Sequence, residues 1–242
     1  MTPAPFLGIE NVSRHFGGLR AVDEVSFTVS RGEIVSIIGP NGAGKTTLFN
    51  LLTGQLQPSS GTVRFEGRDI GSLRPNERAR LGFGRTFQIS QTLTSMSVLE
   101  NGMVGAFMHE RSLPGAAARA AEALEMVGLS KRAGDRAGSL TLGERRRLEV
   151  ARALAMKPQI VLLDEVMAGL NQTEVREIID MVHALNAAGV AFLVIEHNLK
   201  VVRAFSRRVV VINRGRLLKQ GTADEVLGDP QVIEAYVGKT RS

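Results

Sequence analysis

The stretch Gly39-Pro-Asn-Gly-Ala-Gly-Lys-Thr-Thr47 has the residue types and the spacing of a phosphate-binding loop (P-loop). It fits the pattern G-x-x-x-x-G-K-[ST] and stands between a predicted strand, Glu33–Gly39, and a predicted helix, Lys45–Leu52. Glycines let consecutive backbone N–H groups curl around a phosphate, and the start of the following helix adds partial positive charge. We therefore predict that this loop binds phosphates rather than forming a plain glycine-rich turn.

Two side chains of the loop carry distinct chemistry. Lys45 can reach the β- and γ-phosphates of a nucleotide, and the hydroxyl of Thr46 is a suitable ligand for Mg²⁺. The positions that we predict to bind the nucleotide are Gly39, Asn41, Gly42, Ala43, Gly44, Lys45, Thr46 and Thr47.

An apolar run, Ile160–Asp164, ends in an acid and is followed by Glu165. A P-loop site needs a carboxylate at the end of a neighbouring strand for the magnesium shell, and Asp164 fits this need. Glu165 can supply the base that hydrolysis requires near the γ-phosphate. An apolar run followed by Asp-Glu is common in isolation, so its value comes from its pairing with the P-loop.

His197 directly follows the apolar run Val190–Glu196. A lone histidine is usually structural, but the ends of parallel strands are where α/β folds place ligands. A neutral imidazole at this place can sense a γ-phosphate. Gln88, after the apparent strand Gly84–Phe87, is uninformative in isolation.

The stretch Leu140–Glu144 precedes a helical pattern, which we expect over Arg145–Met156. Thr141 is a candidate helix cap, and Gly143 lets a backbone approach a ligand closely. Taken alone, these residues are equally compatible with an ordinary helix start.

The elements that must position these residues alternate between short β-branched runs and amphipathic helical patterns, as in an α/β protein. The buried-strand candidate Glu33–Gly39 and the continuous apolar runs Ile160–Asp164 and Val190–Glu196 are typical of parallel strands covered on both faces. Shorter alternating runs predict an antiparallel side sheet. They are Leu7–Val12, Val25–Val29 and Thr62–Glu66.

The middle of the chain, from Val98 to about Ala155, is mostly helical in composition. Ala116–Val127 has strong helix formers, and Gly128 is a plausible C-terminal stop. Because no Pro/Ser-rich linker separates this block from its neighbours, we interpret it as a helical insertion in one domain.

Composition excludes several classes of protein. The 242 residues contain no Cys, which excludes a disulfide framework, a thiolate metal site and a cysteine nucleophile. The net charge of +6 suits nucleic acid, an anionic membrane surface or a polyphosphate ligand alike. The N-terminus lacks a signal-peptide pattern, and the longest apolar run, Ala187–Ile195, is far shorter than a membrane span. We therefore expect any action at a membrane to require a partner.

The order of the motifs resembles that of the nucleotide-binding subunit of ABC transporters, over essentially the whole chain. These motifs are GPNGAGKTT, Gln88, LTLGE, IVLLDE, AGLN and IEH. Within that family the chain is most similar to the ATPases of branched-chain (hydrophobic) amino acid importers. The stretches that carry this likeness are Arg85–Gln88, Met96–Asn101, Arg146–Leu154, Ala168–Asn171 and Val232–Gly238.

The resemblance implies a P-loop NTPase (RecA-like) core with a mainly parallel central sheet, an antiparallel β side sheet and an inserted helical subdomain. We expect a single ABC-type nucleotide-binding domain over residues 1–242. Its core and β subdomain would occupy residues 1–87 and 157–242, and its helical subdomain residues 88–156.

Roles for individual residues also follow from the resemblance. Phe16 matches the aromatic residue that stacks on adenine, the alternative being a core Phe. Gln88 matches the loop glutamine that contacts magnesium and the attacking water, so the magnesium set becomes Thr46, Gln88 and Asp164. The catalytic set becomes Glu165 as the carboxylate, His197 as the switch histidine, Gln88 and Lys45.

Leu140, Thr141, Leu142, Gly143 and Glu144 match the signature motif, which in this family completes the ATP site of the opposing subunit. The usual signature is LSGGQ, so Thr141, Leu142 and Glu144 depart from it. Val166 stands where the family usually has Pro, and Asn171 where many relatives have Asp.

The expected function is that of an ATP-hydrolysing motor subunit of an ABC importer for branched-chain or other hydrophobic amino acids, with ATP and Mg²⁺ as cofactors. Its expected partners are a second ABC ATPase subunit (identical or paralogous), two transmembrane permease subunits and, indirectly, a solute-binding protein. The expected location is the cytoplasmic face of the inner (plasma) membrane.

Two alternatives remain at this point. One is an importer ATPase for another small solute, such as urea or amides. The other is a soluble ABC-type ATPase that acts on nucleic acid. The basic residues are scattered and not interleaved with aromatics, so we expect no nucleic-acid partner.

Overall fold

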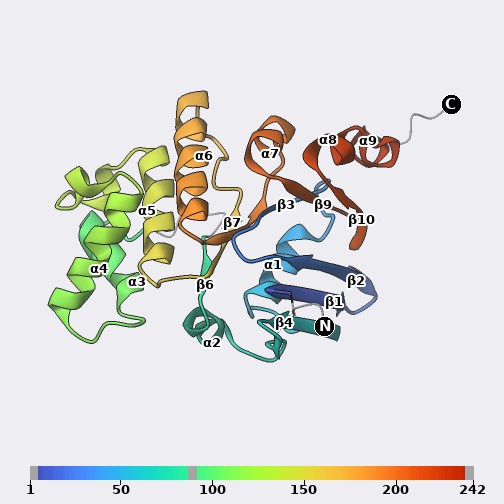
Figure 1. The fold of residues 1–242 in the computed structure, drawn as a ribbon, viewed down its shortest axis with the longest axis horizontal. Coiled ribbons are helices and arrows are strands. Elements are labelled where there is room, and N and C mark those ends of the chain that lie inside the picture. The colour runs from blue at the N-terminus through green and yellow to red at the C-terminus, as the bar shows by residue number, and fades with distance from the viewer. Residues whose placement is uncertain (1–4, 87–91, 238–242) are drawn as a thin grey trace. The chain divides into compact units, whose positions relative to one another are not determined.

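The computed structural model describes residues 5–86 and 92–237, which form two compact units. Unit 1 comprises Met1–Arg78 and Ala191–Ser242, and unit 2 comprises Ala79–Val190. In Figure 1 unit 1 carries the blue and red ends of the chain, and unit 2 the colours from green to orange. Each unit contains parallel strands together with helices, which confirms the predicted α/β class.

The first sheet of unit 1 is antiparallel, with the strand order β2-β1-β4-β5. In β2, buried Val25, Phe27 and Val29 alternate with exposed residues, as expected for a sheet with one covered face. The predicted side sheet is therefore confirmed. The bounds of its strands are β1 Leu7–Phe16, β2 Leu19–Val29, β4 Ser60–Phe65 and β5 Arg68–Asp69.

The second sheet of unit 1 has the order β10-β9-β3-β8. Strand β3 (Ile34–Ile38) is parallel to β8 (Ala191–Ile195) and to β9 (Arg208–Asn213), whereas β10 (Arg216–Gly221) is antiparallel to β9. Every residue of β3 and β8 is buried, which accounts for the unbroken apolar run of β8 and for a β3 that is apolar except at Ser36. The helices of this unit are α1 (Lys45–Leu52), α7 (Leu199–Phe205), α8 (Ala223–Leu227) and α9 (Pro230–Val237).

Arg78, in the short helix α2 (Pro75–Arg80), is fully buried and supports α1 from its far end. Its guanidinium donates to the carbonyl oxygens of Leu51 at 2.6 Å and of Leu52 at 2.7 Å. Burial lowers the pKa of Arg78 to about 10, so this group stays charged at neutral pH. A cation at the last carbonyls of α1 is favourable for the helix dipole, whose positive end faces the P-loop.

Unit 2 contains two parallel strands, β6 (Phe83–Arg85) and β7 (Ile160–Asp164). Helices α3 (Val98–Ala106), α4 (Leu113–Met126) and α5 (Leu142–Leu154) pack against one another, as Figure 1 shows. Two single-turn 3₁₀ helices, Ser130–Arg132 and Ala137–Ser139, connect α4 to α5, and α6 (Gln172–Ala187) follows β7. The predicted helical block is therefore present.

The end of α4 and the start of α5 show how well capping signals in the sequence predict helix bounds. Helix α4 ends just before Gly128, whose φ of +68° is the left-handed conformation that glycine supplies at helix ends. The predicted start of the next helix at Arg145 is wrong, because α5 begins at Leu142. Thr141 and Glu144 form a capping box that starts the helix three residues earlier.

Candidate functional site

The P-loop lies in unit 1, between the buried strand β3 and helix α1. Gly44 has a φ of +103°, and a Cβ at this position would lie 2.2 Å from the carbonyl oxygen of Ala21. The turn between β9 and β10 braces the same loop, because the N–H of Gly215 donates to the carbonyl of Ala43 at 2.9 Å. Only glycine fits at Gly44, so the loop places backbone rather than side chains around its centre.

Lys45 begins α1 with a buried side chain, and its ammonium donates to the carbonyl oxygens of Gly39 at 2.7 Å and Pro40 at 3.1 Å. The helix has no side-chain cap at Gly44, so no side chain occupies the N–H groups of its first turn. Thr46 and Asn41 are exposed, and Thr47 is half-buried. An uncapped helix start beside a lysine is an anion-binding arrangement.

Two other predicted site residues belong to unit 1. Phe16 ends β1 with 44% of its surface exposed, so the alternative of a core Phe is wrong. The guanidinium of Arg14 lies 4.8 Å from the centre of the Phe16 ring. His197 is exposed, two residues after the end of β8 and directly before Asn198, which caps α7. The adenine-stacking role of Phe16 and the phosphate-contacting role of His197 stay predictions.

The acidic strand end lies in unit 2. Asp164, the last residue of β7, is buried, and its carboxylate lies 3.5 Å from the guanidinium of Arg85 on the neighbouring strand β6. Its backbone N–H donates to the hydroxyl of Thr86 at 3.4 Å. Burial lowers the pKa of Arg85, and the carboxylate of Asp164 partly opposes this effect. Asp164 and Arg85 therefore form a buried ion pair at the ends of β7 and β6.

The sequence predictions do not include Arg85 among the site residues. The sequence signal that could have identified Arg85 is its positive charge near the end of the predicted strand that leads to Gln88. Because residues 87–91 lie outside the described part of the chain, so does the prediction for Gln88.

Glu165 is half-buried and has a φ of +51°. This left-handed conformation costs a residue with a side chain roughly 1–2 kcal/mol, and such conformations cluster at functional sites. Val166 and Met167, which follow it, are buried, so the side chain that replaces the family's usual Pro packs in the interior.

The signature stretch forms the start of α5. The hydroxyl of Thr141 accepts a hydrogen bond from the N–H of Glu144 at 3.2 Å, and the carboxylate of Glu144 accepts one from the N–H of Thr141 at 2.8 Å. The same carboxylate accepts a hydrogen bond from Arg132 at 2.6 Å. The unusual Glu144 therefore caps the helix and pairs with a cation, while Leu142 is 41% exposed.

Helix α6 begins close to the signature. A Cβ at Gly143 would lie 2.8 Å from a carboxylate oxygen of Glu174. Asn171 caps α6, because its side-chain oxygen accepts hydrogen bonds from the N–H groups of Thr173 and Glu174 at 2.9 and 3.0 Å. Asn171 therefore provides a capping oxygen at the position where many relatives have Asp.

Each unit by itself contains an oxygen donor of the kind that Mg²⁺ binds. Mg²⁺ prefers oxygen ligands, and in nucleotide sites it takes one or two protein groups together with phosphate and water. The exposed hydroxyl of Thr46 and the buried carboxylate of Asp164 are groups of this kind. Within residues 5–86 and 92–237 the structure contains no cluster of three His, Asp or Glu side chains that could hold a metal without a ligand.

Residues 22–168 match the protein family described as ABC transporter, which is more than half of the chain. The chain belongs to the ABC transporter family. This ABC ATPase is 39% identical, over 97% of its length and 98% of the relative's, to the high-affinity branched-chain amino acid transport ATP-binding protein LivG of Salmonella typhimurium. It is also 39% identical, with the same coverage, to the corresponding protein BraF of Pseudomonas aeruginosa.

Solved structures support the same assignment. A nucleotide-free ATP-binding cassette from an ABC transporter matches with a TM-score of 0.90 and 34% identity, over 98% of this chain and 100% of that one. The ADP conformation of an ATP-binding cassette matches with a TM-score of 0.89 and 35% identity, again over 98% and 100%. The fold is that of a P-loop NTPase, and the ABC ATPase is an ATP-binding, ATP-hydrolysing chain.

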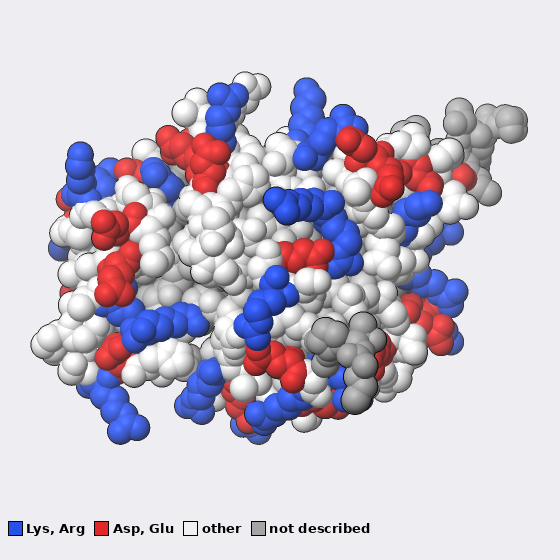
Figure 2. Space-filling view, viewed as in Figure 1, with Lys and Arg blue, Asp and Glu red and all other residues white. Residues whose placement is uncertain are grey.

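The charged side chains on the drawn surface are of both signs. Figure 2 shows Lys and Arg interspersed with Asp and Glu over the face that is drawn. Mixed charge of this kind differs from the basic stripe of a nucleic-acid-binding surface. In the described part of the chain, every helix is too short or too polar to cross a bilayer.

Proposed function

We propose that this ABC ATPase is the motor subunit of an importer for branched-chain or other hydrophobic amino acids. The observation that carries the proposal is the near end-to-end similarity to LivG and BraF, whose names specify branched-chain amino acid transport. An importer for urea or amides remains the alternative, because the ATPase does not select the cargo.

The proposed mechanism assigns ATP binding to the P-loop. Its backbone N–H groups and the start of α1 hold the phosphates, and Lys45 moves from the carbonyls of Gly39 and Pro40 to the β- and γ-phosphates. Asn41, Gly42, Ala43, Gly44 and Thr47 belong to the same cradle, and Phe16 stacks on the adenine.

Hydrolysis is assigned to a separate set of side chains. Glu165 accepts the proton of the attacking water, Gln88 orients that water, and His197 contacts the γ-phosphate. Thr46, Gln88 and Asp164 are the proposed ligands of Mg²⁺, which when bound neutralises phosphate charge. Arg85 places a positive charge 3.5 Å from the carboxylate of Asp164.

The signature residues Leu140–Glu144 are proposed to contact the ATP held by a second ATPase subunit. A bacterial ABC transporter cassette with a TM-score of 0.80 to this chain has been described as dimeric. ATP would then favour the closed dimer, and hydrolysis would remove that preference. We place two permease subunits and, indirectly, a solute-binding protein with this dimer, at the cytoplasmic face of the inner membrane. The helical subdomain is proposed to span residues 88–156.

The experiment is reconstitution of the complex in liposomes with candidate solute-binding proteins. Leucine-loaded binding protein is expected to stimulate ATP hydrolysis and to drive uptake of labelled leucine, and Glu165→Gln is expected to abolish both. Stimulation by urea or an amide instead of leucine would replace the proposed cargo. Stimulation by DNA or RNA in the absence of permeases would reject the importer function.

A further inference from the structure

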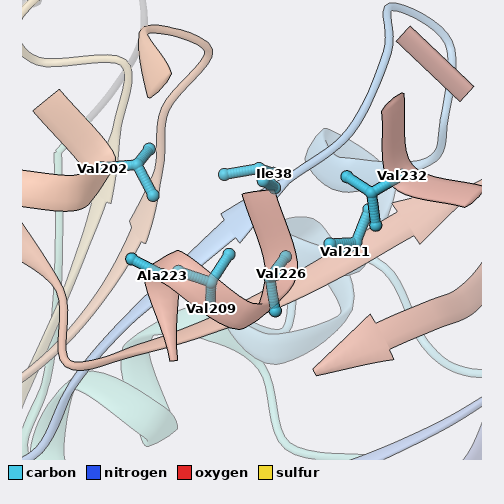
Figure 3. Packing of buried hydrophobic residues seen from close by; sticks show 7 residues of the cluster. All are labelled: Ile38, Val202, Val209, Val211, Ala223, Val226 and Val232. Atoms are coloured by element: carbon cyan, nitrogen blue, oxygen red, sulfur yellow. The ribbon is translucent and has the colours of Figure 1, made fainter. Parts of the chain in front are cut away.

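The hairpin turn between β9 and β10 lies at the same edge of the sheet as the P-loop. The P-loop follows β3, the turn follows β9, and these two strands are parallel neighbours. Figure 3 shows that Ile38, the last residue of β3, shares a buried cluster with Val209 and Val211 of β9. Because this packing fixes the end of β9, the turn that follows it has a firm base beside the P-loop.

Gly215 in this turn holds one peptide group of the P-loop. Its N–H donates to the carbonyl oxygen of Ala43 at 2.9 Å. That carbonyl belongs to the same planar trans peptide as the N–H of Gly44, which therefore points the opposite way. The hydrogen bond from Gly215 thus sets the direction of the N–H of Gly44, which is one of the backbone groups of the phosphate-binding loop.

Asp23 on β2 binds the other side of the same turn. Its backbone N–H donates to the carbonyl oxygen of Gly215 at 2.8 Å. Its buried carboxylate accepts a hydrogen bond at 2.8 Å from Nε of Arg216, the first residue of β10, and a longer one at 3.4 Å from Arg20. The hydrogen bond from Arg216 lowers the pKa of Asp23, so the carboxylate is ionised at neutral pH. The turn is therefore bonded to β2 on one side and to the P-loop on the other.

The backbones of β2, the turn and the P-loop are in close contact. A Cβ at Gly44 would lie 2.2 Å from the carbonyl oxygen of Ala21. A Cβ at Gly215, whose φ is +80°, would lie 3.0 Å from the carbonyl oxygens of Arg20 and Ala21. Because these contacts involve backbone atoms rather than flexible side chains, a shift of the turn is transmitted to the P-loop.

We propose that the ion pair between Asp23 and Arg216 is a clamp that positions the P-loop for ATP. It acts through the N–H of Gly215 on the peptide between Ala43 and Gly44, so Asp23 and Arg216 are positioning residues. Without the clamp, only a fraction of the molecules holds this peptide in the binding orientation, and the apparent ATP affinity falls by that fraction. This inference rests on the proposed binding of ATP at the P-loop.

The test is calorimetric titration of ATP into the purified full chain and its variants, with thermal unfolding measured in parallel. Asp23→Asn and Arg216→Gln are each expected to weaken ATP binding about fivefold, the upper scale for one partly exposed ion pair. The double variant is expected to bind ATP as weakly as each single variant, because both changes remove the same clamp. Arg216→Lys retains a charge for Asp23 and is expected to stay within about twofold of the unmodified chain.

The two single variants separate the clamp from a general effect of charge. Asp23→Asn makes the chain more positive and Arg216→Gln makes it more negative, so charge alone would strengthen ATP binding in the first variant and weaken it in the second. Unchanged or tighter ATP binding in Asp23→Asn would overturn the proposal. A double variant whose loss of affinity is the product of the two single losses would overturn it as well.

Arg64 on β4 provides the matched control, because it forms an exposed ion pair with Glu10 at 3.3 Å in the same unit. Arg64→Gln is expected to leave the ATP affinity unchanged, and a loss equal to that of Arg216→Gln would contradict the clamp. Lys45→Ala checks the P-loop itself. Lost ATP binding in Lys45→Ala together with full binding in Asp23→Asn would reject the clamp alone, whereas full binding in Lys45→Ala would reject both the P-loop assignment and the clamp.

Discussion

Helices α1 and α5 both begin at a stretch that is predicted to contact ATP, but their first turns are built differently. At α1 the preceding residue is Gly44, and no side chain caps the N–H groups. At α5 the side chains of Thr141 and Glu144 form a complete capping box. The first helix therefore leaves its N–H groups for a phosphate, whereas the second is stable without any ligand.

This difference shows how each motif depends on its sequence. The P-loop relies on backbone geometry, so its glycines are the sensitive positions. The signature begins its helix with its own side chains, and Thr141 provides the capping hydroxyl that Ser has in the usual motif. Glu144 illustrates the second case, because it provides the N3 acceptor of the capping box and also pairs with Arg132.

The largest expected effect comes from a matched pair of glycine substitutions. Gly44→Ala should weaken ATP binding by at least ~100-fold, because a left-handed residue would acquire a Cβ against the backbone of Ala21. Gly143→Ala should leave ATP binding by the isolated chain within about threefold, since its nearest neighbour is the end of the flexible Glu174 side chain. Calorimetric titration measures both, and similar losses of affinity in the two variants would remove the contrast.

The next effect separates binding from hydrolysis. Glu165→Gln should reduce the rate of ATP hydrolysis ~100-fold, the scale of a lost general base, while ATP binding is retained. The amide of Gln has nearly the same shape as the carboxylate of Glu, so the left-handed backbone conformation at Glu165 should persist. Turnover close to that of the unmodified chain would show that another group acts as the base.

A smaller effect is expected at the cap of α5. Thr141→Ala removes the acceptor for the N–H of Glu144 and should cost about 1 kcal/mol, which is roughly 2–4 °C in Tm for a chain of this size. Thr141→Ser keeps the hydroxyl and should restore the Tm. If the Thr141→Ala and Thr141→Ser variants unfold at the same temperature, the hydroxyl does not stabilise this helix.

The smallest effect concerns the charge of Glu144. Glu144→Gln retains an oxygen for the capping box but loses the ionic attraction to Arg132, so the loss should be below ~1 kcal/mol and should vanish in high salt. Glu144→Ala loses both interactions and should remain destabilised in high salt. Thermal unfolding at two salt concentrations compares them, and a salt-independent loss in the Gln variant would exclude the ion pair as its cause.

Local signals in the sequence predicted several parts of the molecule correctly. Helix α1 spans Lys45–Leu52 and β7 spans Ile160–Asp164, as the P-loop pattern and the apolar run indicate. The start of α5 was predicted three residues too late, although the signal T-x-x-E was present in the printed sequence. Thr141 is a candidate cap in the sequence, and a cap at this residue places the first helical residue at Leu142.

The parts that were not predicted depend on contacts between distant positions. Arg85 meets Asp164 only because β6 and β7 are neighbouring parallel strands. Arg78 is buried at the end of α1, although arginine is usually exposed, because the carbonyls of Leu51 and Leu52 accept hydrogen bonds from its guanidinium. No spacing rule relates these positions, so the sequence alone does not bring them together.

The sequence by itself determined the chemistry of this protein. The glycines, Lys45 and Thr46 define a phosphate site, and Asp164 with Glu165 defines acids at a strand end, because these functions need particular residue types at short separations. The tertiary structure decided which groups support them. Arg85 lies beside Asp164 because β6 and β7 pair, and Arg78 lies at the end of α1 because α2 packs there, so burial strengthens both polar contacts.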